Sequence, residues 1–276
     1  MIQVIGAGLA GCEAAWQIAQ AGEEAELFEM KPARYSPAHK SPLFAELICS
    51  NSLKAARIES AAGLLKEEMR RLGSLLTECA ASCAVPAGGA LAVDREEFSS
   101  LVTERIREHP RIHVHEGEEI RELPREGIAI VATGPLTSDA LAEQIQALCG
   151  GGLSFFDAAA PIVTADSLDM SQVFCASRYD KGGDDAYLNC PMDKPAYEAF
   201  REALVEAERA PVHDFDVRDP KVYEGCMPIE VLAQRGMDAM RYGPMKPVGL
   251  RDPATGRRPW AVVQLRREDR EGTLYN

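Results

Sequence analysis

The chain has 276 residues, of which 46% are hydrophobic and 26% charged, so it is long enough for one large globular domain or two modest ones. This composition excludes collagen, a coiled coil and wholesale disorder. No apolar run approaches the roughly eighteen residues of a membrane span, and the N-terminal run lacks the pattern of a secretory leader. We therefore expect a cytoplasmic protein.

The acidic balance restricts what the chain can bind. Thirty Lys and Arg residues stand against 43 Asp and Glu residues, which gives a net charge of −13. An evenly spread charge of this sign repels a polyanion, so any nucleic-acid role needs a local basic surface. Residues 241–270 are a candidate, because they contain eight Lys and Arg against three Asp and Glu. Scattered arginines on a solvated surface are the alternative interpretation.

The eight cysteines are scattered along the chain without a Cys-x-x-Cys pair. Such a distribution predicts neither a disulfide framework nor a zinc site, and we expect no bound metal. Most of these residues should be reduced thiols that pack as small hydrophobic side chains.

The N-terminal segment has the pattern of a strand, a helix and a second strand. Residues 2–5 predict a short strand, residues 8–20 an alanine-rich helix, and residues 24–30 a second buried strand. Together they predict a βαβ unit. Residues 30–53 contain three prolines and little periodicity, so we expect a long loop that lines a site.

Two helices are predicted next. Between residues 55 and 76, apolar residues such as Ile58, Leu65 and Leu72 recur at steps of three and four, which predicts one amphipathic helix. The segment that starts at Asp94 resembles a capping box, and its acidic first turn suits the dipole of a second helix.

The later elements complete the expected domains. Residues 112–115 predict a strand with a hairpin partner at 119–123, and the apolar run at 127–133 predicts a strand buried on both faces. The fold class is therefore α/β, with a Rossmann-like domain over residues 1–155. Residues 156–276 predict a smaller α+β inserted domain, in which one helix, at 195–207, is clear.

A glycine motif lies between the first strand and the first helix. Gly6 permits a tight turn, Gly8 lets the backbone approach a pyrophosphate, and Gly11 lets helix and strand pack closely. Glu29 ends the next strand, where its carboxylate can accept from ribose hydroxyls. This pattern predicts a bound dinucleotide, against the alternative of a glycine-rich turn without a ligand. The expected cofactor contacts are Gly6, Ala7, Gly8, Leu9, Ala10, Gly11, Glu29, Met30, Lys31, Ala132, Thr133 and Gly134.

The choice between FAD and NAD depends on the strand that ends at Gly134. Its Ala132-Thr133-Gly134 sequence resembles the strand end of two-dinucleotide-binding flavoproteins, where a strand returns beneath FAD. Together with a glycine motif that begins at residue 6, this favours FAD. A buried strand that ends in an ordinary turn is the alternative.

Many separate segments carry a family resemblance. The chain resembles the folate- and FAD-dependent tRNA uracil-5-methyltransferases, the TrmFO family formerly called Gid. The matching segments are residues 6–11, 29–32, 44–53, 63–70, 85–95, 177–182, 187–191, 224–228, 243–249 and 261–266.

The resemblance implies a reaction and its cofactors. A one-carbon unit would pass from 5,10-methylenetetrahydrofolate to C5 of the T-loop uridine of tRNA, with reducing equivalents from NADPH or NADH reaching it through FAD. By motif match, the thiolate of Cys226 would add to uracil C6, because C5 becomes nucleophilic only after such an addition. Cys49 would lie near the flavin and remove the C5 proton or hold the methylene unit. Both roles come from the family.

Partners and alternatives follow from this resemblance. We expect tRNA phosphate contacts from Arg57, Lys246, Arg251, Arg257 and Arg258. An FAD-dependent oxidoreductase acting on a small molecule is one alternative, and a noncatalytic tRNA-modification flavoprotein scaffold is another.

One departure from the family pattern concerns the C-terminus. The chain ends at Asn276, whereas family members continue with a segment that returns to the FAD-binding domain. We expect either an inactive fragment or a split protein whose second chain supplies the remainder. The expected consequences are exposed apolar surface, weak FAD retention and little or no activity from this chain alone.

Overall fold

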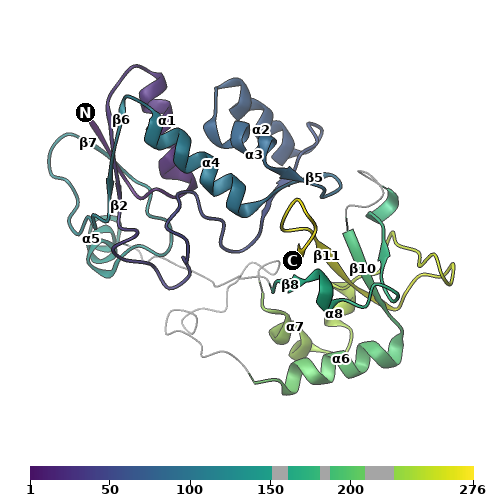
Figure 1. Ribbon diagram of the computed structural model, residues 1–276. Helices are drawn as coiled ribbons and strands as arrows, with labels where there is room; N and C mark the ends of the chain where they lie inside the picture. Colours follow the sequence, from purple (N-terminus) through teal and green to yellow (C-terminus); the bar gives the residue numbers. More distant parts are fainter. Residues whose placement is uncertain (151–160, 181–186, 209–226) are drawn as a thin grey trace. The chain divides into compact units, whose positions relative to one another are not determined.

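The computed structural model describes residues 1–150, 161–180, 187–208 and 227–276, which belong to two compact units (Figure 1). The first unit comprises residues 1–84 and 93–157, and the second comprises residues 85–92 and 158–276. Within the described ranges, none of the helices has both the length and the apolar character that a membrane crossing requires.

A parallel four-stranded sheet forms the centre of the first unit. Its order is β6-β2-β1-β7, so β2 and β7 lie on either side of β1. The strands are β1 (Ile2–Ile5), β2 (Ala25–Glu29), β6 (Ile112–Glu116) and β7 (Ile128–Val131). Each neighbouring pair is parallel, as in a doubly wound nucleotide-binding sheet. The predicted Rossmann-like α/β class is confirmed.

Five helices accompany this sheet in the described part of the first unit. They are α1 (Leu9–Gln20), α2 (Ala61–Arg71), α3 (Leu75–Ser82), α4 (Arg95–Glu108) and α5 (Asp139–Cys149). Helix α1 contacts all four strands and α4, and α4 also contacts β6 (Figure 1). Val4, Leu27 and Phe98 are completely buried in this unit. The predicted cap of α4 is present, because the Asp94 carboxylate accepts from two amides of the first turn.

The single helix predicted over residues 55–76 is wrong. Strand β3 (Ser52–Ala55) precedes it, and two helices, α2 and α3, occupy the segment. They are separated by Gly73, whose φ of +76° ends the first helix. Ser60 and Ser74 each accept a hydrogen bond from the third amide of the helix that follows. The expected apolar stripe is consequently split, and Leu72 is 76% exposed.

Two strand predictions also fail. Residues 119–123 form no strand, because the chain turns at Gly117, whose φ is +78°, and β6 pairs with β2 instead of a hairpin partner. The run at 127–133 does form β7, but the strand lies at one edge of the described sheet. Its side chains are exposed, including Ile128 at 63%, so the strand is not buried on both faces.

Short strands and helices make up the described part of the second unit, which is mixed α+β as predicted. One antiparallel sheet has the order β11-β10-β9, and a two-stranded sheet has the order β12-β8. These strands are β8 (Val163–Thr164), β9 (Phe174–Cys175), β10 (Tyr187–Met192), β11 (Ala261–Arg266) and β12 (Leu274–Tyr275). The helices are α6 (Lys194–Glu206), α7 (Ile229–Arg235) and α8 (Ala239–Tyr242), with 3₁₀ turns η1 (Ala165–Ser167) and η2 (Arg178–Asp180).

A small core holds the second unit together. Tyr197 of α6 is 1% exposed, packs with Met240 and Ala261, and donates its hydroxyl to the Met237 carbonyl at 2.8 Å. The remaining short strands are β4 (Ala84–Val85) and β5 (Ala90–Val93).

Candidate nucleotide-binding site

The glycine motif forms a tight loop between β1 and α1. Gly6 has a φ of +98°, which a residue with a side chain rarely adopts. A Cβ atom on Gly11 would lie 1.7 Å from the Gly6 carbonyl oxygen, so this position admits glycine alone. At Gly8, the N-cap of α1, a Cβ atom would meet nothing within 4 Å. The loop is therefore closed toward the helix and open at Gly8, which suits a diphosphate at a helix N-terminus.

The Glu29 carboxylate is fixed at the end of β2. One oxygen accepts from the Ala7 amide at 2.8 Å and the other from the Lys31 amide at 3.0 Å. Glu29 is 7% exposed, and because each carboxylate oxygen has two lone pairs, each can accept a further donor. Its position beside the glycine loop fits the acceptor of ribose hydroxyls that the sequence predicts.

The segment after β7 meets the glycine loop. The Ala132 amide donates to the Ile5 carbonyl at 2.8 Å, and a Cβ atom on Gly6 would lie 2.9 Å from the Ala132 carbonyl oxygen. Beyond it, the hydroxyls of Thr133 and Thr137 are 2.6 Å apart. The carboxyl ends of β1 and β7 thus lie together at one edge of the sheet, where ligands of this fold bind.

These segments enclose a cavity of about 250 Å³. It is lined by all the predicted cofactor residues except Gly11, which packs behind the loop. The loop at residues 30–53, which the sequence expects to line a site, contributes His39, Glu46 and Ile48. The sequence did not indicate the lining residues that follow β6 and β7 or belong to α5, which are Glu118, Glu119, Ile120, Pro135, Leu136, Thr137, Ser138 and Leu141. The strand order could have indicated the residues after β6 and β7, because parallel strands bring their carboxyl ends to the same edge of a sheet.

His39 belongs to the loop after β2, is half-buried and lines the cavity. Its Nδ1 atom lies 2.5 Å from the Ser36 hydroxyl. Burial lowers the pKa of His39 below its ordinary value, and the nearby Lys31 lowers it further against the opposing effect of Glu46. The ring therefore favours its neutral form at this site.

Lys31 acts on the loop rather than on the open cavity. Its side chain is buried, and its Nζ atom donates to the carbonyls of Ser41 and Leu43 and lies 3.4 Å from the Glu46 carboxylate. The Lys31 charge is thus already balanced within the loop. Lys31 still lines the cavity, and its predicted contact with the cofactor would therefore come from its backbone and not from its ammonium group.

Arg95 anchors the same loop from the first turn of α4. Its Nη1 atom donates to the carbonyls of Leu47 and Ile48 at 2.9 and 3.1 Å. These two residues directly precede Cys49, whose side chain is exposed. Cys49 itself is not among the lining residues, although its neighbour Ile48 is. The loop thus places Cys49 next in sequence to a residue of the cavity lining.

The other expected catalytic thiol, Cys226, lies outside the described residues, so its relation to Cys49 stays a prediction. Cys12 is fully buried under the glycine loop, where its thiol lies 3.4 Å from the Ala7 carbonyl. Burial raises the pKa of the Cys12 thiol well above its ordinary value, so this side chain packs and does not react.

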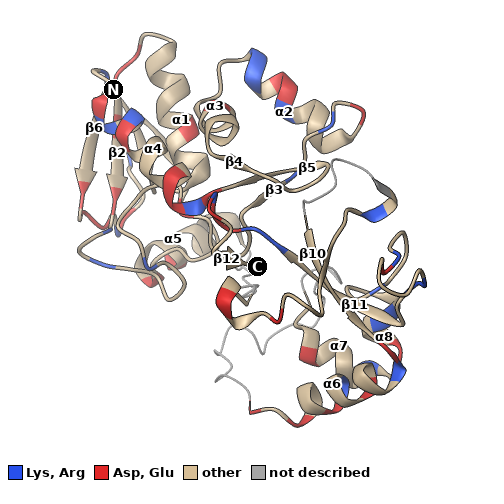
Figure 2. Ribbon diagram, turned by 45° about the vertical axis from the view of Figure 1, so that its right-hand side comes forward, with Lys and Arg blue, Asp and Glu red and all other residues tan. Residues whose placement is uncertain are grey.

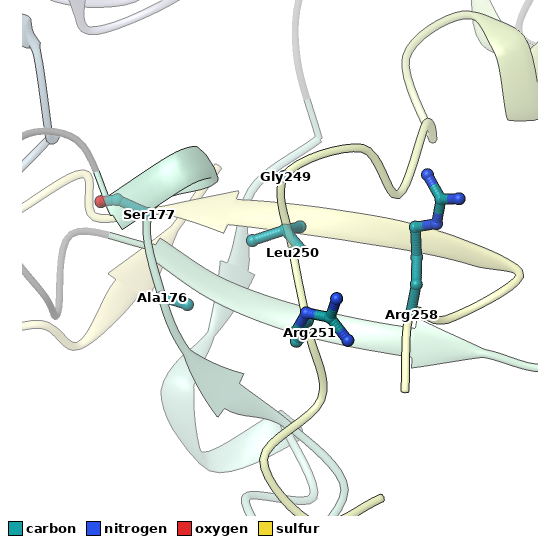
Figure 3. A pocket seen from close by; sticks show the side chains of 6 residues that line it. All are labelled: Ala176, Ser177, Gly249, Leu250, Arg251 and Arg258. Carbon is teal, nitrogen blue, oxygen red and sulfur yellow. The ribbon is translucent and has the colours of Figure 1, made fainter. Parts of the chain in front are cut away.

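The five residues expected to contact RNA fall in both units. Arg57 is exposed in the first unit, between β3 and α2. Lys246, Arg251, Arg257 and Arg258 are exposed in the second unit, and Figure 2 shows basic residues near β11 and α8. The structure brings Arg251 and Arg258 to the lining of one cavity (Figure 3).

Comparison with known proteins identifies the family. The sequence model of the family described as glucose inhibited division protein A (GidA) matches residues 1–276. The chain belongs to this family. Among curated relatives, this GidA-family chain is 60% identical over 276 residues to the methylenetetrahydrofolate–tRNA-(uracil-5-)-methyltransferase TrmFO of Acetivibrio thermocellus. It is 59% identical over 277 residues to the protein of the same name from Geobacter sulfurreducens.

Both alignments cover 100% of the GidA-family chain but 62% and 63% of the relatives, so the chain spans less than two thirds of their length. The resemblance to TrmFO enzymes predicted from the motifs is confirmed. Among solved structures, Aquifex aeolicus GidA superimposes with a TM-score of 0.52 at 12% identity, covering 77% of this chain and 44% of that chain. At this identity the likeness shows a shared fold.

Proposed function

We propose that the chain binds FAD in the cavity of the first unit and takes part in folate-dependent methylation of uracil C5 in tRNA. The observation that carries the cofactor assignment is the cavity, which joins the glycine loop, Glu29 and residues 132–134. The reaction is supported by the 60% and 59% identity to proteins named as TrmFO methyltransferases.

Different residues of the cavity would bind different parts of the cofactor. Backbone amides at the N-terminus of α1 would hold the pyrophosphate, for which the missing side chain of Gly8 leaves room. Glu29 would accept from the ribose hydroxyls while it keeps its bonds to Ala7 and Lys31. When bound, FAD supplies the redox chemistry that links NADPH or NADH and 5,10-methylenetetrahydrofolate to the uracil ring.

The two thiols act on the uracil. The Cys226 thiolate adds to C6, and the electron pair of the C5–C6 double bond moves to C5, where it bonds to the methylene carbon of the donor. The bond between this carbon and its nitrogen carrier would break as two electrons, supplied by NADPH or NADH through FAD, bring it to the methyl level. Cys49 then accepts the C5 proton, the C5–C6 double bond re-forms, and the Cys226 thiolate leaves. The exposure of Cys49 and its place next in sequence to the lining residue Ile48 support its part in these steps.

Tritium release from tRNA labelled at uridine C5 tests the reaction. Because we expect slow turnover from this chain alone, the assay is run as a single turnover with excess protein, FAD, NADPH and 5,10-methylenetetrahydrofolate. We expect release by the wild-type chain and none by Cys226→Ala. Cys175→Ala is the matched control, because Cys175 is exposed in β9 of the second unit and should not affect release.

The outcomes separate the candidate functions. Release by Cys226→Ala at the wild-type rate, or the absence of release by the wild-type chain, contradicts the proposed reaction. NADPH oxidation that proceeds equally without tRNA and without folate indicates an oxidoreductase acting on a small molecule.

A further inference from the structure

A second cavity, of about 590 Å³, lies within the second unit (Figure 3). It is lined by Ala176, Ser177, Gly249, Leu250, Arg251 and Arg258. Two of these side chains are guanidinium groups, and none of the lining residues that the structure describes is acidic. The Arg251 and Arg258 side chains are both exposed, so water and solutes reach them. The cavity therefore presents positive charge that no carboxylate in its lining neutralises.

The loop that carries Arg251 is held in a fixed conformation. Arg178 donates to the carbonyls of Lys246 and Val248, at 2.5 and 2.9 Å. Leu250 is 3% exposed and packs against Phe174 and Val262. Because the residues on both sides of Gly249 are anchored, Arg251 projects from a supported position, which lowers the entropy lost when it binds an anion.

Tyr179 lies beside this cavity in an unusual conformation. Its φ of +59° is rare for an aromatic residue, and its side chain is 60% exposed. The Tyr179 amide donates to the Gly249 carbonyl at 2.9 Å, and a Cβ atom on Gly249 would lie 2.9 Å from the Tyr179 ring. The ring thus rests on the backbone of a cavity residue while much of its surface faces solvent. Strained, exposed residues of this kind gather at binding sites.

We propose that this cavity and Tyr179 form a binding site for one nucleotide of single-stranded RNA. Arg251 and Arg258 bind a backbone phosphate, since guanidinium groups pair with phosphate oxygens through two parallel hydrogen bonds. The base stacks on the Tyr179 ring, as bases do on aromatic residues of proteins that bind single strands. This inference rests on the proposed function, which makes RNA the substrate.

Two observations favour RNA over a small anion as the ligand. The arginines are exposed rather than enclosed, as a site that follows a continuing polymer requires. They also belong to residues 241–270, which have eight Lys and Arg against three Asp and Glu in a chain whose net charge is −13. A local excess of this size attracts a polyanion more strongly than it attracts a single charge.

Fluorescence anisotropy with a labelled oligouridylate tests the site, in the absence of FAD, folate and nicotinamide. We expect the Kd of the double variant Arg251→Gln/Arg258→Gln to rise about tenfold or more, with a shallower salt dependence. Arg270→Gln is the matched control, because Arg270 is exposed in the same segment 241–270 but does not line the cavity. Its Kd should stay within about twofold of the wild-type value.

Stacking is tested separately at Tyr179. Tyr179→Phe keeps an aromatic ring and should keep the wild-type Kd, whereas Tyr179→Leu should weaken binding several-fold. The loss should be larger for the single strand than for a duplex of equal length, whose bases are already stacked. Circular dichroism and thermal unfolding verify that each variant is folded.

The results distinguish this inference from the proposed function. Equal weakening by Arg270→Gln, or an unchanged Kd in the double variant, overturns the RNA site, even if tritium release is normal. Competition by a polyglutamylated folate that depends on Arg251 and Arg258, with no RNA binding there, also overturns it and assigns the cavity to a small carboxylate. Arginine-dependent RNA binding without any tritium release supports the site and contradicts the methylation.

Discussion

The Glu29 carboxylate accepts a hydrogen bond from the Ala7 amide at 2.8 Å, which ties the end of β2 to the glycine loop after β1. This bond connects two neighbouring strand ends exactly where the cavity of the first unit lies, at the carboxyl edge of the sheet. Because its partner is a backbone amide of the loop, Glu29 shapes the site as well as offering an acceptor to a ligand.

Replacing Glu29 by Gln should destabilise the first unit. Both Glu29 oxygens accept from buried backbone amides, and an amide NH₂ group in place of one oxygen would face an N–H donor. A buried donor left without an acceptor costs about 1–3 kcal/mol. Urea unfolding measures the change, with Glu26→Gln on the same strand as the control. Equal stability of the Glu29 and Glu26 variants would show that the two amide bonds contribute nothing.

Substitutions at Gly11 and Gly8 should have different effects. Gly11→Ala puts a methyl group into the Gly6 carbonyl, so the loop must move, and we expect a lower Tm together with lost FAD binding. Gly8→Ala has open space for its methyl group and should leave the Tm unchanged while weakening FAD binding. Thermal unfolding and flavin fluorescence measure the two effects. An unchanged FAD affinity in a folded Gly8→Ala variant argues against a pyrophosphate at this position.

Loss of the Arg95 side chain should loosen the loop before Cys49. Arg95→Gln removes the guanidinium that donates to the Leu47 and Ile48 carbonyls, so hydrogen exchange across residues 41–49 should accelerate. Arg105→Gln is the control, since Arg105 is also on α4 but pairs with Glu78 in an exposed ion pair. Identical exchange in the two variants would mean that Arg95 does not hold the loop.

Acidification should destabilise the protein partly through His39. Burial lowers the pKa of His39 below its ordinary value of 6.5, so the folded state prefers the neutral ring. This contribution is complete above pH 6.5 and is lost as the pH falls toward the lower pKa of the folded state. We expect His39→Gln to lose less stability than the wild type between pH 7 and pH 5. Urea unfolding of both proteins at the two pH values measures this loss. An equal loss of unfolding free energy in His39→Gln and the wild type would reject this assignment.

The sequence predicted the parts of the fold that local signals determine. The βαβ unit follows from hydrophobic periodicity with a glycine motif, and the start of α4 follows from the Asp94 cap. The break at Gly73 was missed because the apolar spacing of three and four continues across it, whereas the adjacent Ser74 cap was the available signal.

Other features depend on topology that periodicity does not carry. An apolar run predicts a strand buried on both faces, but Ile128 and Ile130 lie on an edge strand of the described sheet and are exposed. Likewise, the cavity residues that follow β6 and β7 are distant in sequence from the glycine motif. Arg251 and Arg258 line one cavity, and the loop that carries Arg251 is held by Arg178 through a long-range contact that spacing does not reveal.

Equilibrium titration of FAD into the purified chain, followed by flavin fluorescence, tests the central claim most directly. We predict saturable binding of one FAD per chain, weakened by Gly8→Ala, and weaker binding of NADPH at the same cavity. Even a weak complex is measurable in this way, because the free ligand is always present. Failure of FAD to saturate the chain, or equal binding by the Gly8→Ala variant, would contradict the assignment of this cavity to FAD.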